Sequence, residues 1–521
     1  MTEKTTNQQE MDINMCKDDS SYTRKQSYED SRLTHKTLSK SLKESLTKVN
    51  EYYEQNANML TKNFAGAEDS EVHDEQKLSN LQSLTDLKKY SMNMSLSNYE
   101  YQNQRGELSF WATLFTFIKV NIVAGFLFLP NGYKNGGWLF SVVAIFLITA
   151  FTAYCNISIS ECTEAAHTYS FAKIGHKAGG KIGYYVVEIG IAISQICFPC
   201  SYSNLIAHIV NDMINLWFGT EGTHYIKIGL CLALILIPLC MIRNISRLSS
   251  LHFIGDMAVL ATVISLTYES INIISSDPNF NFDNLRTFNT GWAKLLGMSI
   301  TALEGIGVIL PIKQNMKDKK KFNLVIIIGT FAVGFILMTF PLIMYLCYQD
   351  KVSEIILNNL PLNKFYIQII LVMMVFSVII VYPVVLYPSF LIFSKFCCGS
   401  GDHLAASKDS THLSNNNIEG ENKTQSNQRI GWKQYLLENM LRIFIVSLTI
   451  IIGIASIDRF DTYISLFGCG ICTPIAFIFP SIFHYLLYKD KQSKLRNFFD
   501  IFATILGIAI SVVVLIFTLI N

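Results

Sequence analysis

Two apolar segments carry glycines and a Leu-Pro pair at positions that would interrupt a helix. The first reads Lys119-Val-Asn-Ile-Val-Ala-Gly-Phe-Leu-Phe-Leu-Pro130, and the second reads Thr301-Ala-Leu-Glu-Gly-Ile-Gly-Val-Ile-Leu-Pro311. An interrupted helix leaves free N–H groups at one half-helix end and free carbonyls at the other. An α-carboxylate suits the N–H groups and an α-ammonium suits the carbonyls, so the two segments predict a site for a zwitterionic solute. Glycine and proline also serve close packing or kinks in membrane helices, and that alternative stays open.

The expected contacts to the solute are mostly main-chain groups. In the first segment they involve Asn121, Ile122, Val123, Ala124, Gly125 and Phe126. In the second segment they involve Thr301, Leu303, Glu304, Gly305 and Gly307. The N–H groups of residues 124–126 would hold the carboxylate, and carbonyls around residues 121–122 and 301–303 would hold the ammonium. The two glycines at 305 and 307 would leave room for the side chain of the solute.

Four side chains are candidates for coupling to an ion. Ionisable groups are costly within a membrane, so Glu304 beside the second break is either a substrate- or proton-linked carboxylate or a helix-stabilising group. Lys119 could neutralise a carboxylate or could extend to the membrane interface. His208 would titrate near neutral pH if wet, yet a packed histidine explains it as well, and Ser377 could supply a sodium ligand. We expect proton coupling, with sodium as the alternative.

The elements that must position these residues are long apolar helices. Eleven stretches are long enough to cross about 30 Å of hydrocarbon, which takes roughly 20 residues. They cover Phe110–Leu129, Trp138–Ser158, Ile182–Val210, Ile226–Ile242, Leu251–Ile274, Trp292–Pro311, Leu324–Tyr348, Phe365–Phe393, Leu436–Ile457, Tyr463–Leu487 and Phe498–Ile520. Unpaired backbone is costly in lipid, and the alternating pattern of a barrel strand is absent from the sequence, so an all-α multi-pass protein in a lipid bilayer is expected. The two glycine-bearing segments start five spans apart and therefore enter from opposite sides, as in an inverted repeat.

Composition excludes several classes of function. Of the 521 residues, 50% are hydrophobic and 16% are charged, and the net charge is +2, so neither a soluble domain nor a nucleic-acid partner is expected. We find no Walker loop, no His-Glu-X-X-His and no nucleophile elbow, so no ATP-driven pump, metal or organic cofactor is expected. A membrane-embedded enzyme is a rival class, because Asn204, His208 and Asp212 share one helix face, but packing explains that face equally well.

Charge asymmetry predicts the orientation. Basic residues such as Lys319, Lys320 and Lys321 recur in alternate loops, which places those loops in the cytosol. The N-terminus is then cytosolic, as is a polar loop at about 396–432, and the C-terminus lies on the other side. Residues 1–106 form a polar tail that we expect to be disordered, before a transporter domain at 107–521. A nutrient sensor that signals through this tail is a second alternative, and nothing in the residues identifies a protein partner.

These motifs resemble those of the amino acid/auxin permeases, which include proton-coupled and vacuolar amino acid transporters. Asn121 to Gly137 resembles the first-helix signature of the family, and Leu303 to Met316 is similar to its sixth-helix motif. Gln195 to Tyr202 and Phe460 to Pro480 resemble parts of its third and tenth helices. One departure is Val123, which stands where the family usually has the first glycine of Gly-X-Gly.

The resemblance implies eleven transmembrane helices, with a LeuT-like five-plus-five inverted repeat and one extra helix. It also implies a secondary active transporter that moves amino acids by alternating access and symport with protons or sodium. We expect the plasma membrane or a vacuolar or lysosomal membrane. Val123 would narrow the pocket or shift the substrate, so the identity of the amino acid stays open.

Overall fold

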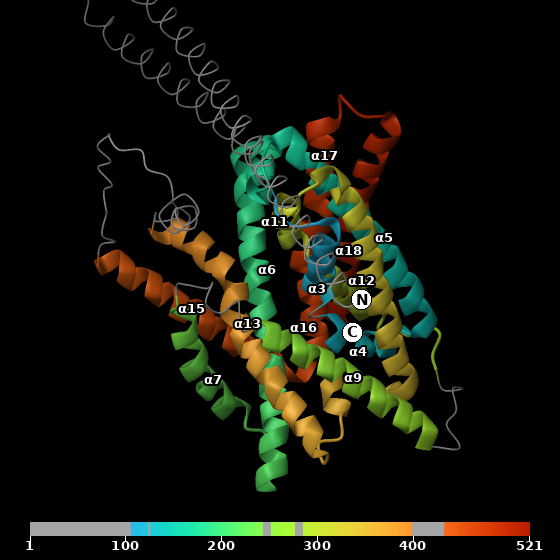
Figure 1. Ribbon diagram of the computed structural model, residues 1–521, viewed down its shortest axis with the longest axis vertical. Helices are drawn as coiled ribbons and strands as arrows, with labels where there is room; N and C mark the ends of the chain where they lie inside the picture. The colour runs from blue at the N-terminus through green and yellow to red at the C-terminus, as the bar shows by residue number, and fades with distance from the viewer. Residues whose placement is uncertain (1–105, 123–124, 243–251, 277–284, 399–431, 521) are drawn as a thin grey trace, which may run out of the picture. The chain divides into compact units, whose positions relative to one another are not determined.

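The computed structural model describes residues 106–122, 125–242, 252–276, 285–398 and 432–520 (Figure 1). The predicted disorder of the N-terminal tail and most of the predicted loop at 396–432 lie outside the described residues. Within them the secondary structure is helical, apart from an isolated bridge between Leu108 and Met316.

The helices follow one another with short connections. Those before the second break are α3 (Phe110–Ile122), the 3₁₀ turn η1 (Gly125–Leu127), α4 (Leu129–Gly136), α5 (Trp138–Ala166), α6 (Phe171–Phe218), α7 (Tyr225–Cys240), α9 (His252–Ser276) and α10 (Trp292–Leu303). Those after it are α11 (Ile306–Asn315), η2 (Lys319–Lys321), α12 (Phe322–Tyr348), η3 (Gln349–Lys351), η4 (Ile356–Asn359), α13 (Phe365–Cys398), α15 (Trp432–Ala455), η5 (Ile457–Arg459), α16 (Phe460–Phe467), the π-helical η6 (Gly468–Cys472) and η7 (Pro474–Ile478), α17 (Phe479–Tyr488) and α18 (Lys494–Ile520).

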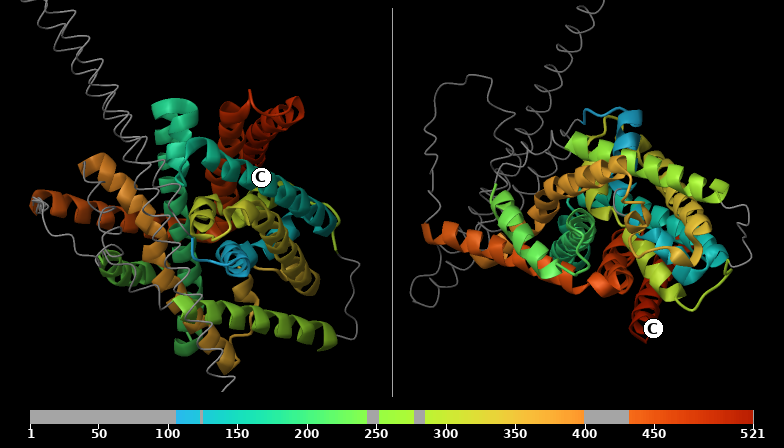
Figure 2. Two further views of the ribbon diagram at one scale, coloured as in Figure 1. Left: turned by 45° about the horizontal axis from the view of Figure 1, so that its top comes forward. Right: turned by 90° about the horizontal axis from the view of Figure 1, so that it is seen from below.

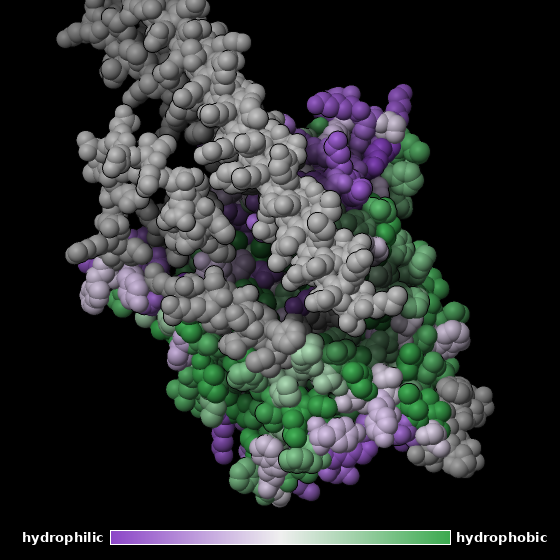
Figure 3. Space-filling model, viewed as in Figure 1, coloured by the Kyte–Doolittle hydropathy of each residue, from purple (hydrophilic) through white to green (hydrophobic). Residues whose placement is uncertain are grey.

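Nine helical segments of the described chain are long and apolar enough to cross a membrane, and α7 is a shorter apolar helix. Large apolar side chains are exposed along them, as on α18, where Ile505 is 61% exposed. Figure 3 shows hydrophobic residues over most of the described face and hydrophilic residues gathered towards its ends. The prediction of a helical multi-pass membrane protein is confirmed. The number of eleven spans stays a prediction.

Helix α6 spans Phe171–Phe218, but its backbone is not helical at Gly179 and Gly180. A short helix from Phe171 therefore precedes the long span, whose predicted start at Ile182 lies directly after the kink. The helix bends at Gly180, whose φ of 64° favours glycine. Hydrophobic spacing did not show the short helix, because it is shorter than a membrane span. Figures 1 and 2 show α6 as the long blue-green helix, and α9 and α13 are packed against each other.

The chain from α16 to α17 occupies the predicted tenth span but is not a regular α-helix. Two π-helical turns separate the α-helical ends, and such turns often occur at functional sites. The first π turn begins at Gly468, where a Cβ would lie 2.0 Å from the carbonyl oxygen of Gly297 in α10. The backbones of α10 and η6 are therefore in direct contact, and only glycine at position 468 permits this approach.

Candidate functional site

The second glycine-bearing segment is interrupted where the sequence predicted. Helix α10 ends at Leu303, and Glu304 is extended, with φ −71° and ψ 122°. Gly305 follows with φ −158° and ψ 12°, and α11 begins at Ile306. The last carbonyls of α10 and the first N–H groups of α11 therefore lack regular helical partners beside Glu304 and Gly305.

The first glycine-bearing segment is interrupted as well. Helix α3 ends at Ile122, and the described chain resumes at Gly125 as a 3₁₀ turn before α4 begins at Leu129. Gly125 and Phe126 are both buried, and the Phe126 ring lies 5.9 Å from that of Phe340 in α12. Val123 and Ala124, which are expected ligands, lie outside the described residues, as does the side chain of Ile122.

The two interrupted helices lie antiparallel, with their breaks side by side. A Cβ on Gly305 would lie 1.8 Å from Oδ1 of Asn121, and a Cβ on Gly125 would lie 2.5 Å from Cβ of Ala302. Further along, the main chain of Gly291 approaches Asn135, and α3 packs against α11 while α4 packs against α10. As residue numbers rise in one segment they fall in the other, so the free ends of the half-helices meet in one place.

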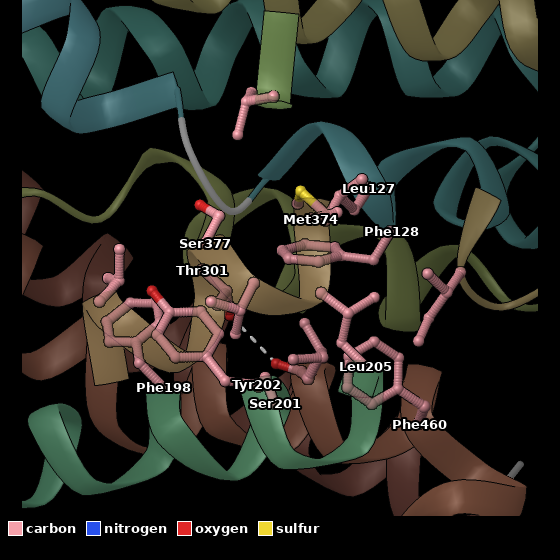
Figure 4. Close-up of a pocket in the computed structure, with 15 residues that line it drawn as sticks. Leu127, Phe128, Phe198, Ser201, Tyr202, Leu205, Thr301, Met374, Ser377 and Phe460 are labelled. Carbon is pink, nitrogen blue, oxygen red and sulfur yellow. Dashed lines mark hydrogen bonds between the residues drawn. The ribbon is translucent and has the colours of Figure 1, made fainter. Parts of the chain in front are cut away.

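A cavity adjoins the two breaks (Figure 4). The volume of the cavity, counted as the space that the centre of a water molecule can occupy, is about 50 Å³. One water molecule requires roughly 10–15 Å³ by the same measure. Its lining comes from both broken segments, from α6, α9, α13 and α16, and from Ile355 directly before η4. The lining residues are Leu127, Phe128, Phe198, Ser201, Tyr202, Leu205, Val259, Thr301, Ile355, Met374, Ser377, Val378, Val381, Phe460 and Ile464. All of these described lining residues are uncharged.

Four lining residues carry hydroxyl groups, namely Ser201, Tyr202, Thr301 and Ser377. The Thr301 hydroxyl reaches the carbonyl oxygens of Gly297 and Ile464, each at 3.0 Å, and the second contact is dashed in Figure 4. The Ser377 hydroxyl packs against Gly255 of α9, where a Cβ would lie 2.4 Å from its oxygen. The buried Ser201 hydroxyl has no hydrogen-bond partner among the described residues. It is therefore available to a bound solute.

Other expected site residues lie beside the cavity rather than in its lining. Leu303 is buried, Glu304 is half-buried in the break, and the carboxylate of Glu304 has no hydrogen-bond or ion-pair partner within the described part of the chain. The amide of Asn121 occupies the space in front of Gly305 and donates to the carbonyl of Phe117 at 2.7 Å. The space in front of Gly307 is open, since a Cβ there would meet nothing within 4 Å.

Two of the coupling candidates lie outside the cavity lining. Lys119 is exposed in the last turn of α3. His208 is half-buried on α6, with its ring 5.7 Å from that of Tyr225. Neither lines the cavity, whereas Ser377 does. Their roles in coupling stay predictions.

A polar cluster covers the α16 end of the cavity. The main-chain N–H of Phe460 donates to Glu354 at 2.9 Å, and Lys294 donates to Asp461 at 3.0 Å. Burial raises the pKa of Glu354, and the nearby Asp461 carboxylate raises it further, while the Phe460 N–H opposes both effects. Because Ile355 and Phe460 line the cavity, these contacts position part of its wall.

Sequence reasoning missed most of the apolar lining. Phe198, Tyr202 and Leu205 lie on one stretch of α6, and Met374 and Val378 lie on α13. Their helical spacing looks like that of any packed membrane helix, so no pattern separated them from core residues. The only available signal was the motif Gln195 to Tyr202, which contains Phe198, Ser201 and Tyr202.

Comparison with known proteins identifies relatives among amino acid transporters. The family model described as "Transmembrane amino acid transporter protein" matches residues 106–520. Vacuolar amino acid transporter 4 of Saccharomyces cerevisiae is 25% identical over 382 residues, which cover 70% of this chain and 51% of the relative. Amino acid transporter AVT3B of Arabidopsis thaliana is 24% identical over 406 residues, covering 75% of this chain and 88% of the relative. This chain matches about half the length of the yeast relatives.

Two solved transporter structures are similar at low sequence identity. MhsT in complex with L-phenylalanine is 10% identical with a TM-score of 0.47, covering 78% of this chain and 98% of MhsT. The inward-facing conformation of Mhp1 is 12% identical with a TM-score of 0.48, covering 80% of this chain and 90% of Mhp1. The family match extends over both broken segments and every helix that lines the cavity. It confirms that the sequence motifs resemble those of an amino acid transporter family. This multi-pass membrane chain belongs to the transmembrane amino acid transporter family.

Proposed function

We propose that this chain is a secondary active transporter that moves amino acids across a membrane by alternating access, coupled to protons. The observation that carries the proposal is the meeting of two antiparallel broken helices, at Gly125 with Ala302 and at Asn121 with Gly305, beside a cavity. Half-helix N-termini favour a carboxylate and C-termini favour an ammonium, so this meeting point offers both main-chain dipoles to one zwitterion.

The architecture proposed with this function has eleven membrane segments. The divided first segment and the short α7 would join the nine longer segments, and ten of the eleven would form two inverted halves of five. The antiparallel packing of α3 with α11 and of α4 with α10 supports this arrangement. The names of the yeast relatives support a vacuolar membrane, and the distribution of lysines supports a cytosolic N-terminus.

The cavity favours an amino acid with an uncharged, mainly apolar side chain. Phe128, Phe198, Tyr202 and Phe460 contribute aromatic rings, and the described lining offers no ionised group to a charged side chain. Burying an unpaired charge there would be costly. A neutral amino acid can bury its side chain among these rings while main-chain groups bind its charged ends.

We assign the proton-linked role to Glu304, which lies in the break without a partner among the described residues. The test is uptake of a radiolabelled neutral amino acid into proteoliposomes under an imposed pH gradient or an imposed sodium gradient. The proposal expects uptake driven by the pH gradient alone, and it expects Glu304→Gln to lose this drive while keeping gradient-free exchange. Glu107→Gln, at an exposed position, is the matched control. Uptake that requires sodium and ignores the pH gradient would overturn the coupling.

A further inference from the structure

The buried imidazole of His484 has a carboxylate at each ring nitrogen. Its Nδ1 lies 2.8 Å from Oδ2 of Asp500 in α18, and its Nε2 lies 3.1 Å from Oε2 of Glu161 in α5. A neutral imidazole donates at only one nitrogen, and an ionised carboxylate can only accept. Both contacts are hydrogen bonds only if the imidazole is doubly protonated or one of the two acids carries a proton. The two contacts therefore require that His484, Asp500 and Glu161 together bind one exchangeable proton.

The charges of this cluster balance only while that proton is bound. Arg496 donates to Oε2 of Glu161 at 2.8 Å, so a protonated cluster has two positive and two negative groups, and the charge of the nearby Lys313 is offset by Glu164, 3.9 Å from its ammonium. The side chain of His484 is 2% exposed and that of Asp500 is 0% exposed. Loss of the proton would leave an unbalanced negative charge in a poorly hydrated site, and such a charge weakens the packing around it.

Neutral donors orient Asp500 towards the imidazole. The Tyr154 hydroxyl donates to Oδ1 at 2.6 Å, and the Gln492 amide donates to Oδ2 at 2.9 Å. The Tyr488 ring stacks on His484 with its centroid 5.0 Å away. The charged and titratable groups around the imidazole come from α5, α17 and α18, and through α5 from α11. They are Tyr154, Cys155, Glu161, Cys162, Glu164, Tyr488, Arg496, Asp500 and Lys313.

The cluster connects several helices and has access to solvent. It joins α5, α17 and α18, and α5 is in turn bonded to α11, because Lys313 donates to the carbonyl of Ser160 at 2.6 Å and to Oγ1 of Thr163 at 2.9 Å. Glu161 is 29% exposed and Arg496 is 33% exposed, so protons can enter from that side. Figure 3 shows hydrophilic residues where α17 ends and α18 begins.

We propose that His484, with Asp500 and Glu161, is a proton-binding site distinct from Glu304, and that its occupancy holds α17 and α18 against α5. When the proton leaves, the contacts between these helices weaken. Helix α11 is one half of the second glycine-bearing segment and is bonded to α5. The protonation state of His484 therefore acts on the helices that form the solute site. This last consequence rests on the proposed transport function, whereas the proton site itself does not.

The first test needs no transport. The full chain in lipid nanodiscs is heated at a series of values between about pH 5 and pH 8, the range in which histidine titrates. We expect the unfolding temperature of the wild type to fall with rising pH, and we expect His484→Gln to be less stable at acidic pH and to show a smaller fall than the wild type. The exposed His176 supplies the control, and His176→Gln should keep the wild-type profile. A His484→Gln profile parallel to that of the wild type would overturn the proposal.

A second variant covers the case in which His484→Gln does not fold. Asp500→Asn keeps a hydrogen-bond acceptor for Nδ1 but removes one negative charge, so the cluster should bind its proton less tightly. The fall in unfolding temperature should then move to lower pH. An unmoved profile would contradict a proton shared between His484 and Asp500.

Gradient-free exchange of a neutral amino acid, measured over the same pH series, separates the two proposals. A pH-dependent wild-type rate that becomes flat in His484→Gln supports a link between this site and transport. If no amino acid is exchanged by any variant while the unfolding profiles differ as expected, the proton site stands and the proposed function fails. If exchange occurs and the unfolding profiles match, the proton site fails and the proposed function stands.

Discussion

The amide of Asn121 occupies the space directly in front of Gly305, where a Cβ would lie 1.8 Å from Oδ1. This contact joins the last turn of α3 to the break between α10 and α11. It places the two interrupted helices in register, so that the ends of their half-helices face one site. The predictions below follow from this contact and from the groups around the cavity.

A methyl group at position 305 should separate the two breaks. Gly305→Ala would collide with Asn121, and either the backbone or the amide must move. Because displacements near an ångström at a binding site cost much activity, we expect uptake to fall on the order of tenfold or more. Gly470→Ala, which would meet nothing within 4 Å and lies outside the expected site, should transport normally. Equal uptake by both variants, measured in proteoliposomes at matched protein content, would show that the contact is unimportant.

The free hydroxyl of Ser201 should bind the solute. Ser201→Ala removes a buried group that has no partner among the described residues, so the unfolding temperature should be unchanged or higher. Loss of one hydrogen bond to the solute should raise KM by about three- to tenfold. The control is Ser389→Ala, because the Ser389 hydroxyl donates to the carbonyl of Ala192 at 2.8 Å and does not line the cavity. It should lower stability and leave KM unchanged; an unaltered KM in Ser201→Ala would remove Ser201 from the site.

Glu354 should make stability depend on pH in a particular direction. Burial and the nearby Asp461 raise its pKa, so the folded chain binds this proton more tightly than the unfolded chain does. The contribution of Glu354 to the free energy of unfolding is then most favourable below its ordinary pKa and declines as pH rises through the raised value. Glu354→Gln should match the wild type in acid and exceed it at neutral pH.

Thermal unfolding at several pH values checks this prediction, with Asp350→Asn at an exposed site of the same connection as the control. A Glu354→Gln variant that is less stable than the wild type at neutral pH would mean that the bond from the Phe460 N–H outweighs burial.

Lys313 should hold α11 to α5. Its buried ammonium donates to Ser160 and Thr163, and Lys313→Met would remove both bonds. We expect the free energy of unfolding to fall by about 1–3 kcal/mol. Lys320→Met, at an exposed position, should change it by less than about 0.5 kcal/mol. Denaturant titration in detergent compares the two, and equal stabilities would contradict a structural role for the buried ammonium.

The interruptions were predictable from the sequence because glycine and a following Leu-Pro have backbone consequences that are local. Both breaks lie where Gly125 and Gly305 indicated, and most helix positions follow from hydrophobic length. The short helix before the kink of α6 and the π turns after Gly468 were not predictable, because they depend on a bend and on tertiary packing.

The side-chain partners were less accessible to sequence reasoning. His484 and Glu161 are 323 residues apart in the chain, and no spacing rule relates them. The apolar lining from α6 and α13 has the periodicity of ordinary packing residues. Only the fold brings Phe198, Met374 and Phe460 to one cavity.

The central claim is that main-chain ends of two broken helices bind both charged ends of an amino acid. It is tested most directly by competition against uptake of a radiolabelled neutral amino acid in proteoliposomes. The account predicts that the unlabelled amino acid competes, whereas its methyl ester, which lacks the carboxylate, and its N-acetyl derivative, which lacks the ammonium, do not. Competition by the ester and the N-acetyl derivative as strong as that by the free amino acid would contradict it.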